Sequence, residues 1–439
     1  MSSTQNTIFK AEPGGYLRGD IRVAGDKSIS HRSIMLGALA EGVTQVSGFL
    51  EGEDCLATLG AFRAMGVRID GPEQGRLTIH GVGLHGLRAP NTPLYLGNSG
   101  TSMRLLAGVM AGQAFDVVMT GDASLTRRPM KRVTLPLAEM GAHIESSSNG
   151  TPPLRLSGGH ALHGIDYVMP VASAQVKSSL LLAGLYADGK TCVTEPAPTR
   201  DHTERMLSGF GYAVYRDGNS ICLEGGGRLM ATAIDVPADI SSAAFFMVGA
   251  SIAPDSDLLL RHVGVNPTRI GVINILQEMG GDIELLDRRE VGGEPVADIR
   301  VRSAPLHGIR IPEDQVPLAI DEFPALFIAA ACAEGQTILT GAKELRVKES
   351  DRIQVMADGL TALGGVAKPT SDGIIIAGGS LGGGQINSHG DHRIAMAFAM
   401  AALRAENRIM IEDCANVRTS FPNFLKLARE SGLVISEEG

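Results

Sequence analysis

Apolar residues gather along the chain in blocks that each open on a short polar residue. Six such blocks read GDKSISHRSIML from Gly25, GNSGTSMRLLAG from Gly97, VASAQVKSSLLLAG from Val171, PADISSAAFFMVGA from Pro237, AIDEFPALFIAAA from Ala319 and HGDHRIAMAFAMAA from His389. Short polar side chains accept hydrogen bonds from the unpaired amides of a first helical turn. Each block therefore predicts the start of a largely buried helix. The expected caps are Asp26, Asn98, Ser173, Asp239, Asp321 and Asp391.

A second sequence pattern repeats with the same period as the helix starts. Glycines followed by β-branched or apolar residues end a second helix 38 to 43 residues after each cap, and the caps themselves are 66 to 82 residues apart. Glycine tolerates the left-handed conformation that closes a helix, and the residues after it suit a strand. These glycines are Gly66, Gly141, Gly211, Gly280, Gly364 and Gly432. The pattern predicts six copies of one α/β unit of the form βαβαββ.

The length of the chain adds a division into domains. At 439 residues it is too long for one ordinary core, so two domains of three units each are expected. The expected bounds are residues 21–235 for domain one and residues 1–20 plus 236–439 for domain two. In this arrangement the first twenty residues cross back to complete the second domain.

Charge and cysteine usage exclude several classes of protein. The 39 basic and 48 acidic residues give a net charge of -9, whereas nucleic-acid and membrane-surface proteins usually carry a basic excess. The five cysteines are scattered without metal-ligand spacing, so reduced thiols and no metal site are expected. The N-terminus lacks a leader pattern and no apolar run approaches ~18 residues. We expect an untargeted protein of the bacterial cytoplasm.

Basic residues recur at equivalent places of the repeat, which changes their interpretation. Any one cluster taken alone is typical of a solvated face. Helix N-termini, however, carry unpaired amides and partial positive charge, and cations beside several of them favour a shared anion-binding cleft. Asp239 has no cation beside it in the sequence and is expected to be a cap only. The cations at helix starts are Lys27, Arg32, Arg104, Lys177 and Arg393, and further clusters surround Arg128, Arg200 and Arg352.

Three common motifs do not explain these cations. GVGLHG from Gly81 matches a dinucleotide fingerprint, but Pro90 and Pro93 preclude the helix that must follow. GDKS lacks the Gly-Lys pair of a P-loop. His31, His202 and His392 lack metal-ligand spacing, so hydrogen-bonded or packing roles are expected for them.

Seven motifs occurring together in order from about residue 10 to 425 identify a family. They are GDKSISHR, LGNSGTSMR, GDASLTRRPM, SAQVKSSLLLAG, TRDHTERM, RVKESDR and GDHRIAMA. The set resembles the 5-enolpyruvylshikimate-3-phosphate (EPSP) synthase family, and its wording is closer to the glyphosate-tolerant class II branch. The resemblance implies a two-domain inverted α/β barrel, the enolpyruvyl transferase fold, whose six βαβαββ repeats are shared three per domain, with the active site in the interdomain cleft. It also implies transfer of the enolpyruvyl group of phosphoenolpyruvate to the 5-hydroxyl of shikimate-3-phosphate, without metal or cofactor.

The resemblance assigns roles to individual residues. Asp321 resembles the base and Glu349 the acid, with Lys27 as a helper. Converging cations suit two substrates that each carry a phosphate and a carboxylate. The residues similar to the shikimate-3-phosphate site are Lys27, Ser28, Arg32, Ser173, Ala174, Gln175, Arg200, Asp321 and Lys348. The residues similar to the phosphoenolpyruvate site are Lys27, Asn98, Gly100, Arg128, Gln175, Arg352 and Arg393.

One departure and two alternatives stay open. Many family members carry a lysine where RTSFP has Thr419, so either Arg418 substitutes or the cation is dispensable.

With glycine at position 100, there is room for glyphosate beside phosphoenolpyruvate, and we expect competitive inhibition. The UDP-N-acetylglucosamine enolpyruvyl transferases share the fold but usually carry a cysteine in the loop matching GDASLTRRP, which has none here. A non-catalytic anion-binding protein is the other alternative. We expect a monomer with no nucleic-acid or membrane partner.

Overall fold

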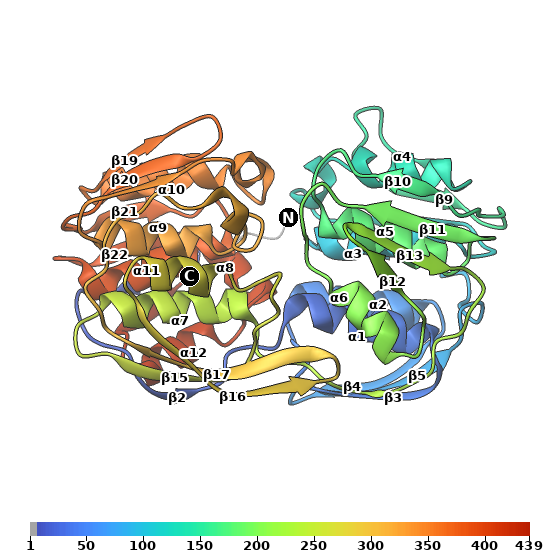
Figure 1. The fold of residues 1–439 in the computed structure, drawn as a ribbon, viewed down its shortest axis with the longest axis horizontal. Helices are drawn as coiled ribbons and strands as arrows, with labels where there is room; N and C mark the ends of the chain where they lie inside the picture. Colours follow the sequence, from blue (N-terminus) through green and yellow to red (C-terminus); the bar gives the residue numbers. More distant parts are fainter. Residues whose placement is uncertain (1–6) are drawn as a thin grey trace. The chain divides into compact units, whose positions relative to one another are not determined.

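The computed structural model describes residues 7–439, and the chain divides into two compact units (Figure 1). The N-terminal unit comprises Gly25–Val236 and the short segment Val291–Glu294. The C-terminal unit comprises the described part of Met1–Ala24 together with Pro237–Glu290 and Pro295–Gly439. The division expected from the sequence has its crossings at residues 21 and 236 and lacks the four-residue exchange at 291–294. Among the described residues, no helix has the length and apolar character that a bilayer span requires.

Three sheets of the same strand order build the N-terminal unit. In each sheet a parallel pair is followed by two antiparallel strands. The first is β14 (Ala233–Asp235), β3 (Glu41–Ser47), β5 (Arg76–Val82) and β4 (Arg68–Glu73). The second is β6 (Leu94–Tyr95), β7 (Val117–Thr120), β9 (Leu154–Ser157) and β8 (His143–Glu145). The third is β10 (Asp166–Val168), β11 (Lys190–Thr194), β13 (Ser220–Glu224) and β12 (Tyr215–Asp217).

Three sheets also build the C-terminal unit, and strands from the start of the chain complete two of them. The first is β16 (Asp282–Val291), β17 (Glu294–Arg302), β15 (Asp257–Gly264) and β2 (Arg18–Ile21). The second is β18 (Gln336–Leu339), β20 (Ile374–Ala377) and β19 (Val366–Pro369). The third is β21 (Gly384–Asn387), β22 (Ile409–Glu412), β1 (Ile8–Ala11) and β23 (Ile435–Glu438). In the second sheet a parallel bridge from Arg310 to Ile338 replaces a fourth strand.

Each sheet is accompanied by one inner and one outer helix. The inner helices are α1 (Lys27–Leu39), α3 (Gly100–Ala111), α5 (Ala174–Gly184), α7 (Ile240–Ile252), α9 (Phe323–Cys332) and α11 (His392–Ala401) (Figure 1). The outer helices are α2 (Glu53–Ala64), α4 (Lys131–Glu139), α6 (His202–Gly209), α8 (Gly271–Glu278), α10 (Arg352–Ala362) and α12 (Phe424–Ser431). Short 3-10 turns are η1 (Leu125–Arg127), η2 (Glu313–Gln315), η3 (Lys343–Val347), η4 (Ala402–Arg404) and η5 (Ala415–Thr419).

The inner helices form the cores of the two units because nearly all of their residues are buried. Every residue of α7 is buried, and so is every residue of α9 except Cys332. In the C-terminal unit α7, α9 and α11 pack against one another. A helix without a polar face must be covered all round, which the three surrounding sheets and outer helices achieve. The prediction of six βαβαββ repeats, three per domain in an inverted α/β barrel, is confirmed.

The expected helix boundaries are confirmed at most positions. The six glycines all have positive φ, between 78° and 121°, directly after the outer helices. Asp26, Ser173, Asp239 and Asp391 cap the inner helices through their side chains. The predicted positions of two caps are wrong by one residue. Ser99, not Asn98, accepts the capping bond of α3, and Glu322 precedes α9, since Asn98 and Asp321 bind charged partners instead.

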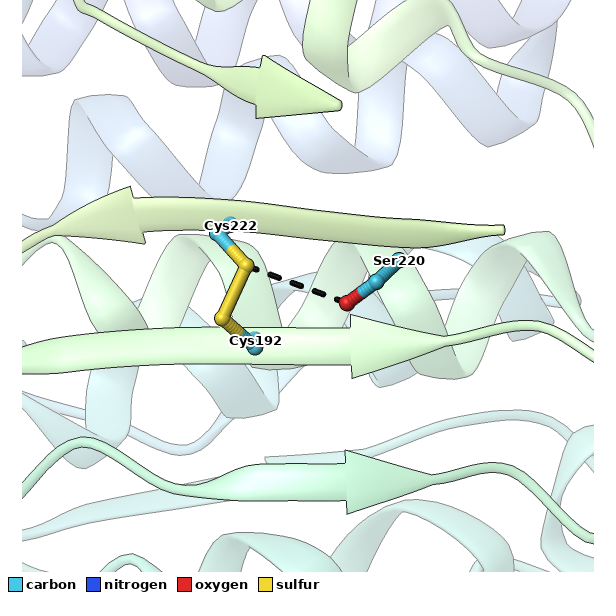
Figure 2. The surroundings of a disulfide bond; sticks show 3 residues. All are labelled: Cys192, Ser220 and Cys222. Atoms are coloured by element: carbon cyan, nitrogen blue, oxygen red, sulfur yellow. Dashed lines mark hydrogen bonds between the residues drawn. A yellow bond between two sulfur atoms is a disulfide. The ribbon is translucent and has the colours of Figure 1, made fainter. Parts of the chain in front are cut away.

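A disulfide between Cys192 and Cys222 corrects the expectation of five reduced thiols. Strands β11 and β13 are antiparallel neighbours whose register sets the two residues opposite each other. Figure 2 shows the two sulfur atoms joining the strands, with the Ser220 hydroxyl 3.8 Å from Cys222 Sγ. Cys55, Cys332 and Cys414 are free. Two cysteines 30 residues apart reveal no pairing in the sequence, because strand register depends on the fold.

Two histidines have the hydrogen-bonded roles expected for them. His31 is fully buried on α1, and its Nδ1 lies 2.8 Å from the Thr58 hydroxyl of α2. That hydroxyl continues to Ser102 of α3 at 2.6 Å, so a polar chain joins three helices. Burial, and then the charges of Lys27 and Arg32, hold the pKa of His31 well below its ordinary value. His202 Nδ1 lies 2.7 Å from Glu294, in the segment 291–294 assigned to the same unit.

The disulfide predicts a thiol count. Unreduced protein unfolded in denaturant is expected to show three reactive thiols, and reduced protein all five. Cys192→Ser is the matched variant: it frees Cys222, so the unreduced count rises by one to four. Titration with a chromogenic disulfide reagent measures each number. Five thiols in unreduced wild-type protein would contradict the bond.

Buried His31 predicts a loss of stability on acidification. Its pKa in the folded protein lies below that of the unfolded chain, about 6.5. The unfolded chain therefore binds the extra proton as the pH falls below ~6.5, and folding loses up to about 1.4 kcal/mol per pH unit from this one group. Urea unfolding between pH 7.5 and 5.5 should show a shallower pH dependence for His31→Asn than for wild type. The exposed His143→Asn variant is the control, and equal slopes for wild type and His31→Asn would refute the assignment.

Candidate active site

The first turns of the inner helices of the N-terminal unit bond to one another. Arg104 of α3 donates from Nη1 to Gln175 Oε1 of α5 at 2.5 Å, and Gln175 Nε2 donates back to the Thr101 hydroxyl at 3.0 Å. Ser173 caps α5, Ala174 is its first residue, and Gly100 is the first residue of α3. The predicted residues of these two helix starts are therefore neighbours, and their unpaired amides form one potential anion-binding surface.

Lys27, the first residue of α1, forms an ion pair with Asp54. Asp54 lies in the first turn of α2 and its side chain is only 8% exposed. No motif in the sequence points to Asp54 as a partner of Lys27. The acidic pair at the start of α2 was a detectable signal, but it is equally typical of ordinary helix-dipole stabilisation. The contact holds the ammonium group of Lys27 at the N-terminus of α1.

Arg32 is buried at the junction of three helices. Its Nε donates to Thr203 of α6 at 2.7 Å and its Nη2 to Ser178 of α5 at 2.7 Å, while Nη1 donates to the carbonyl of Ser28 at 3.0 Å. Burial lowers the pKa of Arg32 to about 10, and the nearby charge of Arg200 contributes to the lowering. Two of the predicted phosphate-binding cations thus lie close enough to repel each other. An anion bound between them would relieve that repulsion.

Asn98, in the loop before α3, is bonded to Arg128, which follows the 3-10 turn η1. Arg128 Nη2 donates to Asn98 Oδ1 at 2.5 Å, and Asn98 Nδ2 donates to Asp122 Oδ2 at 2.7 Å. Asp122 also accepts the backbone amide of Leu125 at 2.7 Å, which fixes the turn that carries Arg128. Asp122 is a second residue that the sequence analysis missed. Its GDAS setting is typical of a simple turn, and only the fold brings it to Asn98.

In the C-terminal unit Asp321 lies among three cations. Its Oδ1 is 3.3 Å from Lys348 Nζ and 3.4 Å from Arg352 Nη1. Arg393, in the first turn of α11, donates from Nη1 to the Asp321 carbonyl at 3.1 Å. Four predicted residues from three segments are therefore in contact. The Asp321 carboxylate therefore faces two cations, and a third binds its backbone carbonyl.

Arg352 is the centre of this cluster. Its side chain is 1% exposed, and it binds Glu349 at 2.6 Å through Nη2 and Asp391 at 2.8 Å through Nε. Burial by itself lowers the pKa of Arg352, but Asp391, Glu349 and Asp321 outweigh it and hold that pKa above the ordinary value. One permanently charged guanidinium thus orients two candidate catalytic carboxylates. Asp391, expected as a cap only, also serves as its ion-pair partner.

Glu322, the neighbour of Asp321, is a further residue that the sequence analysis missed. It is buried, binds the Ser241 hydroxyl at the start of α7, and lies 3.9 Å from both Arg269 and Arg393. Arg269 also reaches Asp239 at 3.1 Å. The cap of α7 therefore does have a cation beside it, contributed by a residue 30 positions away in the sequence. Sequence neighbours alone do not show this contact.

Two charged residues, Asp351 and Arg418, have partners outside the cluster around Arg352. Asp351 caps α10 by accepting the amide of Gln354 at 3.1 Å and pairs with Arg346 at 2.6 Å, so it has a structural role. Arg418 is exposed and pairs with Glu437 at 2.7 Å, while the hydroxyl of Thr419 donates to the carbonyl of Asn416 at 2.7 Å. Of the two alternatives for the missing lysine, this geometry favours the one in which that cation is dispensable.

Taken separately, each unit thus has cations and helix N-termini suited to phosphates and carboxylates, and the C-terminal unit adds a pair of acids. Among residues 7–439, no group of three or more His, Cys, Asp or Glu side chains is arranged to hold a metal ion.

Comparison with known proteins agrees with this chemistry. The family model described as EPSP synthase (3-phosphoshikimate 1-carboxyvinyltransferase) matches residues 11–427. The 3-phosphoshikimate 1-carboxyvinyltransferase of Methylococcus capsulatus is 72% identical over 431 residues, covering 98% of this chain and 99% of the relative. That of Nitrosococcus oceani is 70% identical over 433 residues, covering 98% of each.

A solved structure agrees as well. EPSP synthase from Acinetobacter baumannii is 61% identical, with a TM-score of 0.90 over 99% of this chain and 100% of that one. Sequence and fold therefore agree over nearly the whole length, and the chain belongs to the EPSP synthase family.

Proposed function

We propose that this protein transfers the enolpyruvyl group of phosphoenolpyruvate to the 5-hydroxyl of shikimate-3-phosphate and releases phosphate. This is a step of the shikimate pathway to chorismate and the aromatic amino acids. The observation that carries the proposal is the pair Asp321 and Glu349 on one buried guanidinium, Arg352. The pair occurs in a chain that matches 3-phosphoshikimate 1-carboxyvinyltransferases over nearly its whole length.

Shikimate-3-phosphate would bind mainly to the N-terminal unit. Arg32 and Arg200 are the mutually close cations, and the start of α5 supplies backbone amides. Asp321 and Lys348 of the C-terminal unit complete this site in the proposal. The full set is Lys27, Ser28, Arg32, Ser173, Ala174, Gln175, Arg200, Asp321 and Lys348.

Phosphoenolpyruvate would bind to cations of both units. Arginine suits this role because its planar fork pairs bidentately with a carboxylate or phosphate. Arg128 is held by Asn98, while Arg352 and Arg393 are held by carboxylate and carbonyl groups around Asp321. The full set is Lys27, Asn98, Gly100, Arg128, Gln175, Arg352 and Arg393.

The proton transfers follow from these positions. Asp321 takes the proton of the 5-hydroxyl as the oxygen attacks C2 of phosphoenolpyruvate, and Glu349 gives a proton to the methylene carbon. The tetrahedral adduct then loses phosphate and one methyl proton, which restores the enol ether. Lys27 assists through its positive ammonium group, which stabilises the negative charge of the substrates.

Further properties of the protein remain part of this proposal. Membership of the class II branch rests on the resemblance of several of the seven motifs to that branch. A monomer in the bacterial cytoplasm is what we expect of a small-molecule enzyme with bacterial relatives. The UDP-N-acetylglucosamine enolpyruvyl transferases are disfavoured because the loop at residues 121–132 holds no cysteine.

The acid and base assignments predict the behaviour of two isosteric variants. Asp321→Asn and Glu349→Gln should each lower kcat by about 10²- to 10⁴-fold, because each removes one proton transfer. Asp351→Asn is the matched control: it neutralises a helix cap outside the cluster and should keep nearly full activity. Phosphate release from phosphoenolpyruvate with shikimate-3-phosphate as acceptor measures all three. Wild-type kcat in either isosteric variant would overturn that assignment.

The same assay tests the acceptor. Wild-type protein should release phosphate with shikimate-3-phosphate and none with UDP-N-acetylglucosamine. Release with the second acceptor alone would keep the fold and overturn the proposed substrate, and release with neither would favour a non-catalytic anion-binding protein.

Gly100 predicts the response to glyphosate. An added Cβ at Gly100 would lie 3.1 Å from Arg128 Nη1 and 3.2 Å from Arg104 Nη1, so these guanidinium groups must shift by a few tenths of an ångström. We expect glyphosate to compete with phosphoenolpyruvate, and Gly100→Ala to raise the inhibition constant more than the KM for phosphoenolpyruvate. Gly60→Ala on α2, where an added Cβ meets open space, is the control. An unchanged inhibition constant in Gly100→Ala would refute the prediction.

A further inference from the structure

A buried cluster of three charged side chains lies next to the proposed shikimate-3-phosphate site and has no role in the chemistry above. Lys177 of α5 has a side chain that is 0% exposed. Its Nζ lies 2.7 Å from Glu195 Oε1 and 2.6 Å from Glu204 Oε1. The Glu195 side chain is also 0% exposed, and the only other cation within ion-pair distance of it among the described residues is Arg216, at 3.8 Å.

Such a cluster is a poor way to gain stability. Removing charges from water costs several kcal/mol per ion, and apolar side chains of similar volume often stabilise a core equally well. Burial also raises the pKa of Glu204 in spite of the attraction of Lys177. A buried ion pair of this kind is better explained by the geometry that it imposes on its neighbours.

The geometry is specific at Glu195. This residue follows β11, and its second oxygen accepts both the backbone amide of Thr199 at 2.8 Å and the Thr199 hydroxyl at 2.5 Å. One carboxylate therefore closes the turn 195–199 onto itself while Lys177 anchors it to α5. Arg200 directly follows Thr199 in the chain. Lys177 lies about one helical turn after Ser173, the cap of α5.

A second link reinforces the same junction. The Thr203 hydroxyl of α6 donates to Ser178 of α5 at 2.7 Å, and both accept from Arg32 of α1. The segment that carries Arg200 is thus held on both sides, at Thr199 and at Thr203. Arg200 thus lies between two residues that are tied to α5, Thr203 directly and Thr199 through Glu195.

We propose that Glu195, anchored by Lys177, is a positioning residue that fixes Thr199 and thereby Arg200 for binding the phosphate-bearing acceptor. This inference rests on the proposed function, because it assigns Arg200 to shikimate-3-phosphate. Glu195 does not touch the substrate. It sets the affinity of the acceptor site and leaves phosphoenolpyruvate binding and the proton transfers unaffected.

The test uses two variants of graded severity. Thr199→Val keeps the shape and the backbone amide bond but removes the hydroxyl donor, and Glu195→Gln replaces one accepting oxygen by an amino group. We expect the KM for shikimate-3-phosphate to rise by about tenfold in Glu195→Gln and by less in Thr199→Val, as for loss of a buried hydrogen bond to a charged group. The KM for phosphoenolpyruvate and kcat should change by less than about twofold.

A structural control and a double-mutant cycle separate positioning from general destabilisation. Ser431→Ala on α12 removes a buried hydroxyl bond in the C-terminal unit and should leave both KM values unchanged. In an Arg200→Ala background, Glu195→Gln should have little further effect on the KM for shikimate-3-phosphate, because its effect passes through Arg200. Urea unfolding of each variant confirms that it is folded at the assay temperature.

The outcomes are distinct. Unchanged shikimate-3-phosphate KM in both variants, or an equal effect of Glu195→Gln with and without Arg200, overturns the positioning role while the proposed function stands. Equal rises in both substrates' KM values overturn it too. Failure of wild-type protein to use shikimate-3-phosphate overturns the proposed function itself, independently of Glu195.

Discussion

Burial of the inner helices on every side is the constraint on which the rest of the structure depends. Helix α7 has no exposed residue at all, so nothing along its length can contact a ligand. Polar groups can be presented only where such a helix begins, because there the chain leaves the core and the first amides lack partners. The repeat therefore concentrates much of its chemistry at helix starts. The predicted site residues at the starts of the inner helices are Lys27, Ser28, Asn98, Gly100, Ser173, Ala174, Gln175, Asp321 and Arg393.

Buried charge is the second constraint, and both units satisfy it by pairing. Arg352 is almost fully buried, but it binds Glu349 and Asp391 and lies close to Asp321. Three carboxylates therefore balance its positive charge. Lys177 is equally buried between Glu195 and Glu204. In each case the pairing fixes orientation as well as charge, because a buried side chain that must keep its partner cannot change rotamer freely. Rigid cations of this kind suit two substrates that would otherwise repel each other.

The same logic explains which predictions succeeded. Helix caps and closing glycines depend on local backbone chemistry, so Asp26, Asp391 and Gly432 could be assigned from neighbours in the sequence. Asn98 and Asp321 look like caps by the same rule but bind charged partners, Arg128 and Lys348 respectively. At both positions the helix begins one residue later than the local rule predicts, and those two residues belong to the candidate site.

The amino-acid sequence by itself determined the six-unit repeat and the fold class, and it supplied the cations and carboxylates proposed for the candidate site, since periodicity and helix-end chemistry act over a few residues. Only the tertiary structure decided the partners: Asp54 for Lys27, Asp122 for Asn98, Glu322 beside Arg393, and Cys222 opposite Cys192. It also assigned segment 291–294 to the N-terminal unit. These pairings join residues that are distant along the chain, and strand register and helix packing, which bring them together, depend on the whole core and leave no local pattern in the sequence.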